Sequence, residues 1–127
     1  MLNDKKIAII GVGNMGEALV SGLIGSGSST PKNIICTDIK QDKLSVIKAK
    51  YKVRTTTRNL KAVAEADIII YAVKPQIMAA TLTETAAKLD MSKLVISIAA
   101  GVPLAAMKPV SARIYVSYGL CPTLLPL

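Results

Sequence analysis

The sequence predicts an α/β domain in which a doubly wound, mostly parallel sheet is covered by helices on both faces. Runs rich in isoleucine and valine alternate along the chain with segments of helical periodicity. Strands that are apolar at every position are typical of parallel sheets, which are buried on both faces. The 127 residues, 51% of them hydrophobic, suffice for one compact domain that buries roughly two thirds of its unfolded surface.

Strands and helices follow one another in a regular order. A glycine-rich turn leads from the first strand into the first helix, and a loop of glycine, serine and Pro31 precedes the second strand. Leu44 and Ile47, three residues apart, give the second helix an apolar face. Asp67 opens the fourth strand, and prolines near their starts favour the last two helices. The expected strands are residues 7–10, 33–37, 52–55, 67–73 and 94–98, and the expected helices are residues 15–24, 42–50, 59–66, 76–89 and 103–107.

The net charge of +8 comes largely from one stretch. Residues 40–61 hold eight lysines and arginines and a single acid, Asp42. The chain has no Trp or Phe on which bases could stack, and it has no recognisable nucleic-acid motif, so nucleic acid is not an expected partner. We interpret the run as a solvated surface that also attracts small molecules bearing phosphate.

Composition also excludes several classes of site and location. The chain has no histidine, and its two cysteines, Cys36 and Cys121, lack metal-ligand spacing. Metal catalysis and histidine acid–base chemistry are therefore excluded within this chain. The longest uncharged apolar stretch, residues 94–107, is shorter than the ~20 residues that a membrane span needs. We expect a soluble, cytoplasmic protein that does not enter membranes.

The first strand leads into a Gly-x-Gly-x-x-Gly motif, formed by Gly11, Val12, Gly13, Asn14, Met15 and Gly16. Alone, such a motif is compatible with an ordinary tight turn, but its place between a strand and a helix is that of a Rossmann-like dinucleotide site. Gly11 would make the turn, Gly13 would let a pyrophosphate approach the backbone, and Gly16 would let helix and sheet pack closely. The N–H groups at the start of the helix would hold the phosphates.

Asp38 ends the second strand, 22 residues beyond Gly16. A carboxylate there can accept hydrogen bonds from the adenosine ribose and repel a 2′-phosphate, which favours NAD; Lys40 nearby favours NADP. An aspartate that only caps a helix or stabilises a turn is an equally good interpretation. The cofactor is therefore expected to be NADP or NAD.

Three segments together resemble the N-terminal dinucleotide-binding domain of pyrroline-5-carboxylate reductases. They are Gly-Val-Gly-Asn-Met-Gly-Glu-Ala-Leu (residues 11–19), Ala-Val-Lys-Pro-Gln (72–76) and Ser-Ile-Ala-Ala-Gly-Val (97–102). The resemblance covers roughly residues 5–114. It implies NAD(P)H-dependent reduction of a small cyclic imine, 1-pyrroline-5-carboxylate, to L-proline in proline biosynthesis. It also implies cofactor contacts beyond the glycine motif, from Asn59 on the adenosine side, from Ala72, Val73, Lys74 and Pro75 along the cofactor, and from Ala99, Ala100 and Gly101 at the nicotinamide.

The resemblance further implies that the family's C-terminal helical domain, which dimerises and contacts the substrate, is missing here. We expect a dinucleotide-binding domain over residues 1–114, no catalytic side chain of its own, and self-association through exposed apolar surface. Two other functions remain open: a fragment of a hydroxyacid-dehydrogenase-like oxidoreductase, and a non-enzymatic NAD(P)-binding module.

Residues 115–127 contain no charged side chain and form an atypical tail. They are either an edge strand of a naturally short domain or an out-of-frame reading of a longer gene. At this point the family is expected to continue with the sequence Arg-Val-Met-Pro-Asn-Thr-Pro-Ala-Leu. If the reading frame is shifted by one consistent step, codons compatible with residues 119–127 encode that sequence. A dozen consecutive positions, 116–127, are compatible with the shift. Both interpretations can hold together, because an out-of-frame segment can still pair at a sheet edge.

We predict that the DNA encoding residues 121–125 reads Met-Pro-Asn-Thr-Pro in the shifted frame. Sequencing the gene and its transcript through this region is the measurement. Any other text in that frame would leave the tail as a genuine end of a short domain.

Overall fold

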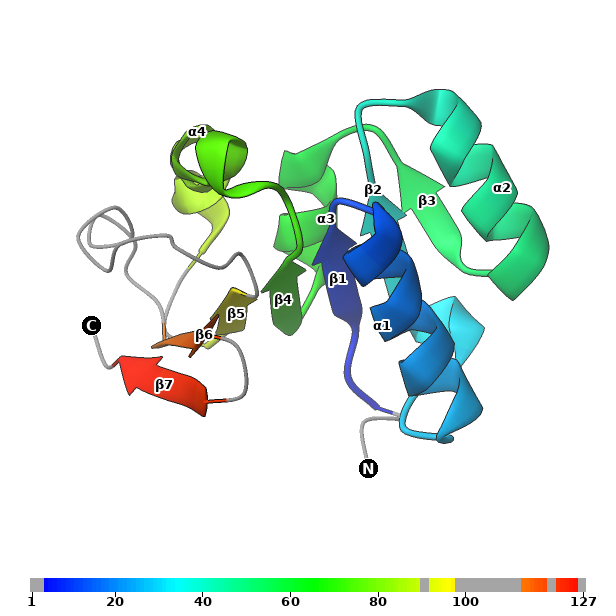
Figure 1. The fold of residues 1–127 in the computed structure, drawn as a ribbon, viewed down its shortest axis with the longest axis horizontal. Coiled ribbons are helices and arrows are strands. Elements are labelled where there is room, and N and C mark those ends of the chain that lie inside the picture. Colours follow the sequence, from blue (N-terminus) through cyan, green and yellow to red (C-terminus); the bar gives the residue numbers. More distant parts are fainter. Residues whose placement is uncertain (1–3, 90–91, 98–112, 119–120, 126–127) are drawn as a thin grey trace.

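A computed structural model describes residues 4–89, 92–97, 113–118 and 121–125. It confirms the predicted fold class, a doubly wound and mostly parallel sheet (Figure 1). The strand order is β3-β2-β1-β4-β5-β6-β7, in which every neighbouring pair is parallel except β6 and β7. The strands are β1 (Ile7–Ile10), β2 (Ile34–Thr37), β3 (Arg54–Thr56), β4 (Ile68–Tyr71), β5 (Leu94–Ser97), β6 (Arg113–Tyr118) and β7 (Cys121–Leu125).

The helices are close to those that the sequence predicts. They are α1 (Asn14–Gly25), α2 (Gln41–Tyr51), α3 (Asn59–Glu65) and α4 (Pro75–Thr85), with 3-10 turns at Pro31–Asn33 and Ala86–Lys88. The second turn tightens the last part of the predicted helix 76–89. The predicted helix at residues 103–107 lies outside the described residues. No helix in the described ranges has the length and hydropathy to span a bilayer.

Three predicted strands need correction at their ends. Asn33 belongs to a 3-10 turn, where its N–H donates to the carbonyl of Thr30, so the second strand begins one residue later. Lys52 is not in a strand: it ends α2 in a left-handed conformation with φ +64°, and its N–H donates to the carbonyl of Lys48. The fourth strand is shorter at both ends: it runs from Ile68 to Tyr71, so Asp67 precedes it and residues 72 and 73 form a loop.

Both faces of β1 and β2 are buried, which explains their uninterrupted apolar runs. Alternate residues of β1 enter different clusters: Ile7 and Ile9 pack under α1 and α2, whereas Ala8 and Ile10 pack under α3 and α4. All four side chains of β1 are almost completely inaccessible to solvent. The central strand is thus held between two layers of helices, and its carboxyl end is a fixed point of the fold.

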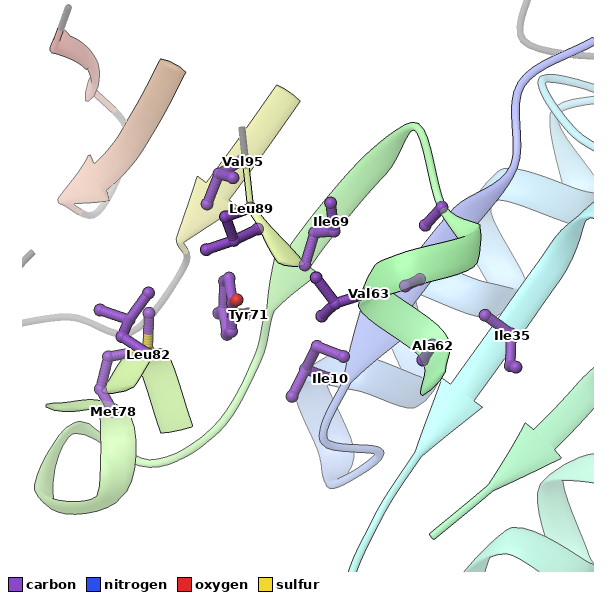
Figure 2. Close-up of a cluster of buried hydrophobic side chains, with 12 residues drawn as sticks. Ile10, Ile35, Ala62, Val63, Ile69, Tyr71, Met78, Leu82, Leu89 and Val95 are labelled. Atoms are coloured by element: carbon purple, nitrogen blue, oxygen red, sulfur yellow. The ribbon is translucent and has the colours of Figure 1, made fainter. Parts of the chain in front are cut away.

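Tyr71 anchors α4 to the sheet in the cluster that Figure 2 shows. Its side chain is fully buried, and its hydroxyl lies 2.7 Å from Oγ1 of Thr85. The Thr85 hydroxyl also donates to the carbonyl of Thr81, 2.8 Å away. Burial raises the pKa of Tyr71 to about 12, so the phenol stays neutral and can take part in this network.

On the opposite face, one carboxylate joins α1 to α2. Oε2 of Glu17 accepts hydrogen bonds from Nζ of Lys50 at 3.1 Å and from the hydroxyl of Tyr51 at 3.0 Å. The bond to Lys50, followed by that to Tyr51, holds the pKa of Glu17 below its usual value. The first turn of α1 is thus linked to the end of α2.

We predict that Tyr71→Phe lowers the free energy of unfolding by about 1 kcal/mol, because it removes one buried hydrogen bond while Thr85 keeps its bond to Thr81. Urea denaturation at pH 7 is the measurement. Tyr51→Phe, which loses a hydrogen bond at a partly exposed site, is the control and should cost less.

The same variant tests the pKa shift. Since the pKa of Tyr71 in the fold, about 12, exceeds its usual value of 10.0, its contribution is complete below pH 10 and is lost as the pH rises through 12. The stability of the unmodified chain should therefore fall more steeply over this range than that of Tyr71→Phe. Parallel curves would contradict the assignment.

Candidate functional site

The loops at the carboxyl ends of β1, β2 and β4 meet at one edge of the sheet. After β1 the chain crosses to β2 on one side, and after β3 it returns to β4 on the other side of β1. Figure 1 shows the loop that leaves β1 and the chain that leads from β4 into α4 at the same end of the sheet. Ligands of doubly wound folds bind at such a switch point, so the topology places the candidate site here.

The three motif glycines have different surroundings. Gly11 adopts φ +96°, and its N–H donates to the carbonyl of Thr37 at 2.9 Å, so it makes the predicted turn. A Cβ on Gly16 would overlap the carbonyl oxygen of Gly11, as expected where a helix packs directly on a turn. A Cβ on Gly13 would meet nothing within 4 Å. The side of the loop at Gly13 is therefore open, which suits a backbone that receives a phosphate.

The open side of the loop carries the start of α1. The helix follows Gly13 directly, has no side-chain cap, and makes its first hydrogen bond from the N–H of Glu17 to the carbonyl of Gly13 at 2.9 Å. The N–H groups that precede Glu17 have no acceptor within the helix. Asn14 and Met15 are exposed, whereas Val12 is buried and fixes the loop to the core. This arrangement can bind an anion through backbone donors.

Asp38 lies beside the glycine loop and is bound to it. Its Oδ2 accepts a hydrogen bond from the N–H of Val12 at 3.2 Å, and its Oδ1 accepts one from the N–H of Lys40 at 3.0 Å. The bond to Lys40, two residues on, is the turn role that the sequence left open. The bond to Val12 was not predicted, and it joins the ends of β1 and β2.

A cleft of about 290 Å³ follows the carboxyl ends of the strands. Three lysines and one carboxylate, that of Asp38, give it an excess of positive charge. The cleft is lined by Gly11, Gly13, Asp38, Ile39, Lys40, Lys43, Ala72, Val73, Lys74 and Ile77. A positive cleft attracts phosphate groups. Of the basic run at residues 40–61, Lys40 and Lys43 line this cleft.

A smaller hollow of about 90 Å³ adjoins the cleft between α3 and α4. It shares five residues with the cleft and adds Ile10, Thr37, Asn59 and Thr81. Asn59 lies here, with its Nδ2 donating to Oε1 of Glu84 at 2.8 Å. The predicted adenosine-side residue is thus near Asp38, although its amide nitrogen already has a partner.

The loop after β4 forms the opposite wall. The N–H of Ala72 donates to the carbonyl of Ile10 at 2.8 Å, which ties this loop to β1. Ala72, Val73 and Lys74 line the cleft, and α4 begins at Pro75. Ala99, Ala100 and Gly101 lie outside the described residues.

Sequence reasoning missed three cleft residues, Ile39, Lys43 and Ile77. Lys43 was visible only as part of a charged run. Ile39 follows Asp38 directly, and its position after the strand was the one signal for it. Ile77 had no signal, since it reads as an ordinary apolar residue of a helix. In the part of the chain that the structure describes, no cluster of His, Cys, Asp and Glu could hold a metal.

Comparisons with known proteins agree with this geometry. Residues 6–101 match the family described as NADP oxidoreductase, coenzyme F420-dependent. The chain is 45% identical over 103 residues to a pyrroline-5-carboxylate reductase of Methanosarcina acetivorans. The aligned region covers 81% of this chain and 38% of that relative. It is 41% identical over 101 residues to the enzyme of that name from Escherichia coli, covering 80% and 38%. The chain thus spans less than two fifths of these relatives' length.

Solved structures give the same result. A pyrroline-5-carboxylate reductase from Coxiella burnetii superimposes with a TM-score of 0.83 and 36% identity over 90% of this chain and 43% of that one. A Plasmodium falciparum pyrroline carboxylate reductase with NADP bound has a TM-score of 0.76 and 25% identity over 90% of this chain and 42% of that one. The Rossmann-like fold is therefore that of the reductases' dinucleotide-binding domain.

We predict opposite phenotypes for two glycine variants. Gly13→Ala should leave the unfolding midpoint unchanged, because the added methyl meets no atom, but should weaken binding of NADPH and NADH by about tenfold or more. Gly16→Ala should destabilise the fold by roughly 1–3 kcal/mol, because its methyl meets backbone that cannot move aside. Thermal unfolding and fluorescence titration are the measurements. If the two variants behaved alike, the open side of the loop would not be a ligand site.

Proposed function

The chain belongs to the family of NADP oxidoreductases described as coenzyme F420-dependent, and we propose that it is the cofactor-binding part of a pyrroline-5-carboxylate reductase. The reaction is the reduction of 1-pyrroline-5-carboxylate to L-proline with NADPH or NADH. The main support is the glycine loop, which is open only at Gly13 and faces a cleft with three lysines. The relatives named pyrroline-5-carboxylate reductase support the choice of substrate.

The residues present fit a nicotinamide dinucleotide. The turn at Gly11 leads into the start of α1, which offers its first backbone N–H groups to the pyrophosphate. Gly13 leaves the space that a phosphate needs, because no Cβ occupies it. When bound, the reduced cofactor supplies the hydride for the C=N carbon of the cyclic imine.

The loop after β2 binds the adenosine ribose. Asp38 is fixed by two backbone N–H groups, so its remaining lone pairs can accept ribose hydroxyls without a conformational search. Lys40 and Lys43, which line the same cleft, can pair with a 2′-phosphate. The site thus carries a feature suited to each cofactor, and we propose that it accepts both.

The loop from β4 to α4 orients the cofactor on the other side. Ala72 and Val73 present small and apolar side chains to the cleft, and Lys74 adds a charge at the start of α4. Ala72 is bonded to β1, and Tyr71, the residue before it, is bonded to the end of α4, so the β4 end of this wall is held in place. This loop binds and orients the cofactor and transfers no proton.

Hydride transfer needs the imine held against the nicotinamide in a near-attack geometry. We propose that the part of the relatives beyond the matched 38% supplies that contact. We therefore predict that the 127-residue chain binds NADPH or NADH, yet shows no imine-dependent oxidation of either. Fluorescence titration with both cofactors and absorbance at the reduced nicotinamide band are the measurements. Turnover by this chain alone would overturn the prediction.

A chain continued in the shifted reading frame is the positive control and should oxidise the cofactor when the cyclic imine is added. Oxidation that depends on a hydroxyacid or ketoacid instead would favour the dehydrogenase alternative. Cofactor binding without turnover by either chain would favour a non-enzymatic module.

A further inference from the structure

We propose that Lys50 is a positioning residue for the phosphate site: by pairing with Glu17, it keeps that carboxylate from competing with bound phosphate for the positive charge at the start of α1. This inference rests on the proposed function. Neither residue belongs to the glycine motif, and neither lines the cleft. Their pairing acts from outside the site and leaves the backbone donors and the cleft lysines to the cofactor.

Glu17 lies where a carboxylate opposes a phosphate. It is the acidic residue of the first turn of α1, and the free N–H groups of that helix directly precede it. The helix dipole attracts a negative side chain in this turn as it attracts a bound phosphate. Two negative charges at one helix start repel each other, so an uncompensated Glu17 weakens phosphate binding.

Two side chains at the end of α2 hold the carboxylate. Oε2 of Glu17 accepts hydrogen bonds from Nζ of Lys50 at 3.1 Å and from the hydroxyl of Tyr51 at 3.0 Å. Nζ of Lys50 also lies 5.3 Å from the centre of the Tyr51 ring. The bond between them raises the pKa of Lys50 and lowers that of Glu17, so both groups are charged at neutral pH.

Lys43 connects this ion pair with the cleft, which it lines. The hydrogen bonds from Lys50 and Tyr51 lower the pKa of Glu17 most, and the charge of Lys43 lowers it further. The carboxylate is therefore near enough to attract the lysine proposed above to pair with a 2′-phosphate. While Lys50 neutralises Glu17, Lys43 keeps its charge for the ligand. Because the side chains of Lys50 and Glu17 are 60% and 36% exposed, salt should weaken this effect.

The experiment measures dissociation constants of NADPH and NADH for the full chain, Lys50→Gln, Glu17→Gln and the double variant, at low and at high salt. Lys50→Gln should weaken NADPH binding by about two- to fivefold at low salt, as one charge near a helix start does. NADH should lose less, because it has no 2′-phosphate. Glu17→Gln should bind both at least as tightly as the unmodified chain. The double variant should match Glu17→Gln, because Lys50 acts through Glu17.

Lys48→Gln is the matched control. It removes the same charge from the same helix, but Lys48 lines a separate hollow on the surface of α2 with Ser45, Ala49 and Lys52. This variant should bind both cofactors as the unmodified chain does. Equal weakening by Lys48→Gln and Lys50→Gln would reveal only the overall positive field and would overturn the positioning role. Weaker binding by both Glu17→Gln and Lys50→Gln would reveal only a structural link between α1 and α2, which also overturns it.

The outcomes separate this inference from the function on which it rests. If the unmodified chain binds neither NADPH nor NADH, the proposed function fails and the role of Lys50 with it. If the unmodified chain binds them and Lys50→Gln binds them equally well at low salt, only the role of Lys50 is overturned.

Discussion

The close contact between the start of α1 and the turn after β1 is the constraint on which the site depends. Gly16 lies so near the carbonyl of Gly11 that no side chain fits between them. This contact sets where α1 begins and directs its first N–H groups over the end of the sheet. A bulkier residue would push the helix away, and backbone donors and cleft would separate.

The rest of the fold holds this contact in place. β1 is buried on both faces by two clusters of side chains, so its carboxyl end cannot shift without disturbing both layers of helices. Three hydrogen bonds then join the neighbouring loops to that end: Gly11 to Thr37, Val12 to Asp38, and Ala72 to Ile10. The cleft is thus assembled from loops, but each loop is bonded to another element at the edge of a rigid sheet.

The basic residues at positions 40–61 have different roles in the fold. Of the basic run, Lys50 pairs with Glu17 and Arg54 pairs with Glu65, both on the protein surface away from the cleft lining. Lys40 and Lys43 line the cleft, where Lys74 joins them from the loop after β4. A run that looks uniform in the sequence therefore contains both residues that link neighbouring elements and residues that give the cleft its positive charge.

The sequence by itself determined the fold class, the alternation of strands and helices, and the place of the glycine motif. These follow from local periodicity and turn chemistry, which neighbouring residues carry. Tertiary structure decided what distant segments do together. Only the fold brings Asp38 to the N–H of Val12, 26 residues away in sequence, and Ile77 to the cleft that Ile39 lines. Such contacts depend on strand order, and one chain's residue pattern does not encode them locally.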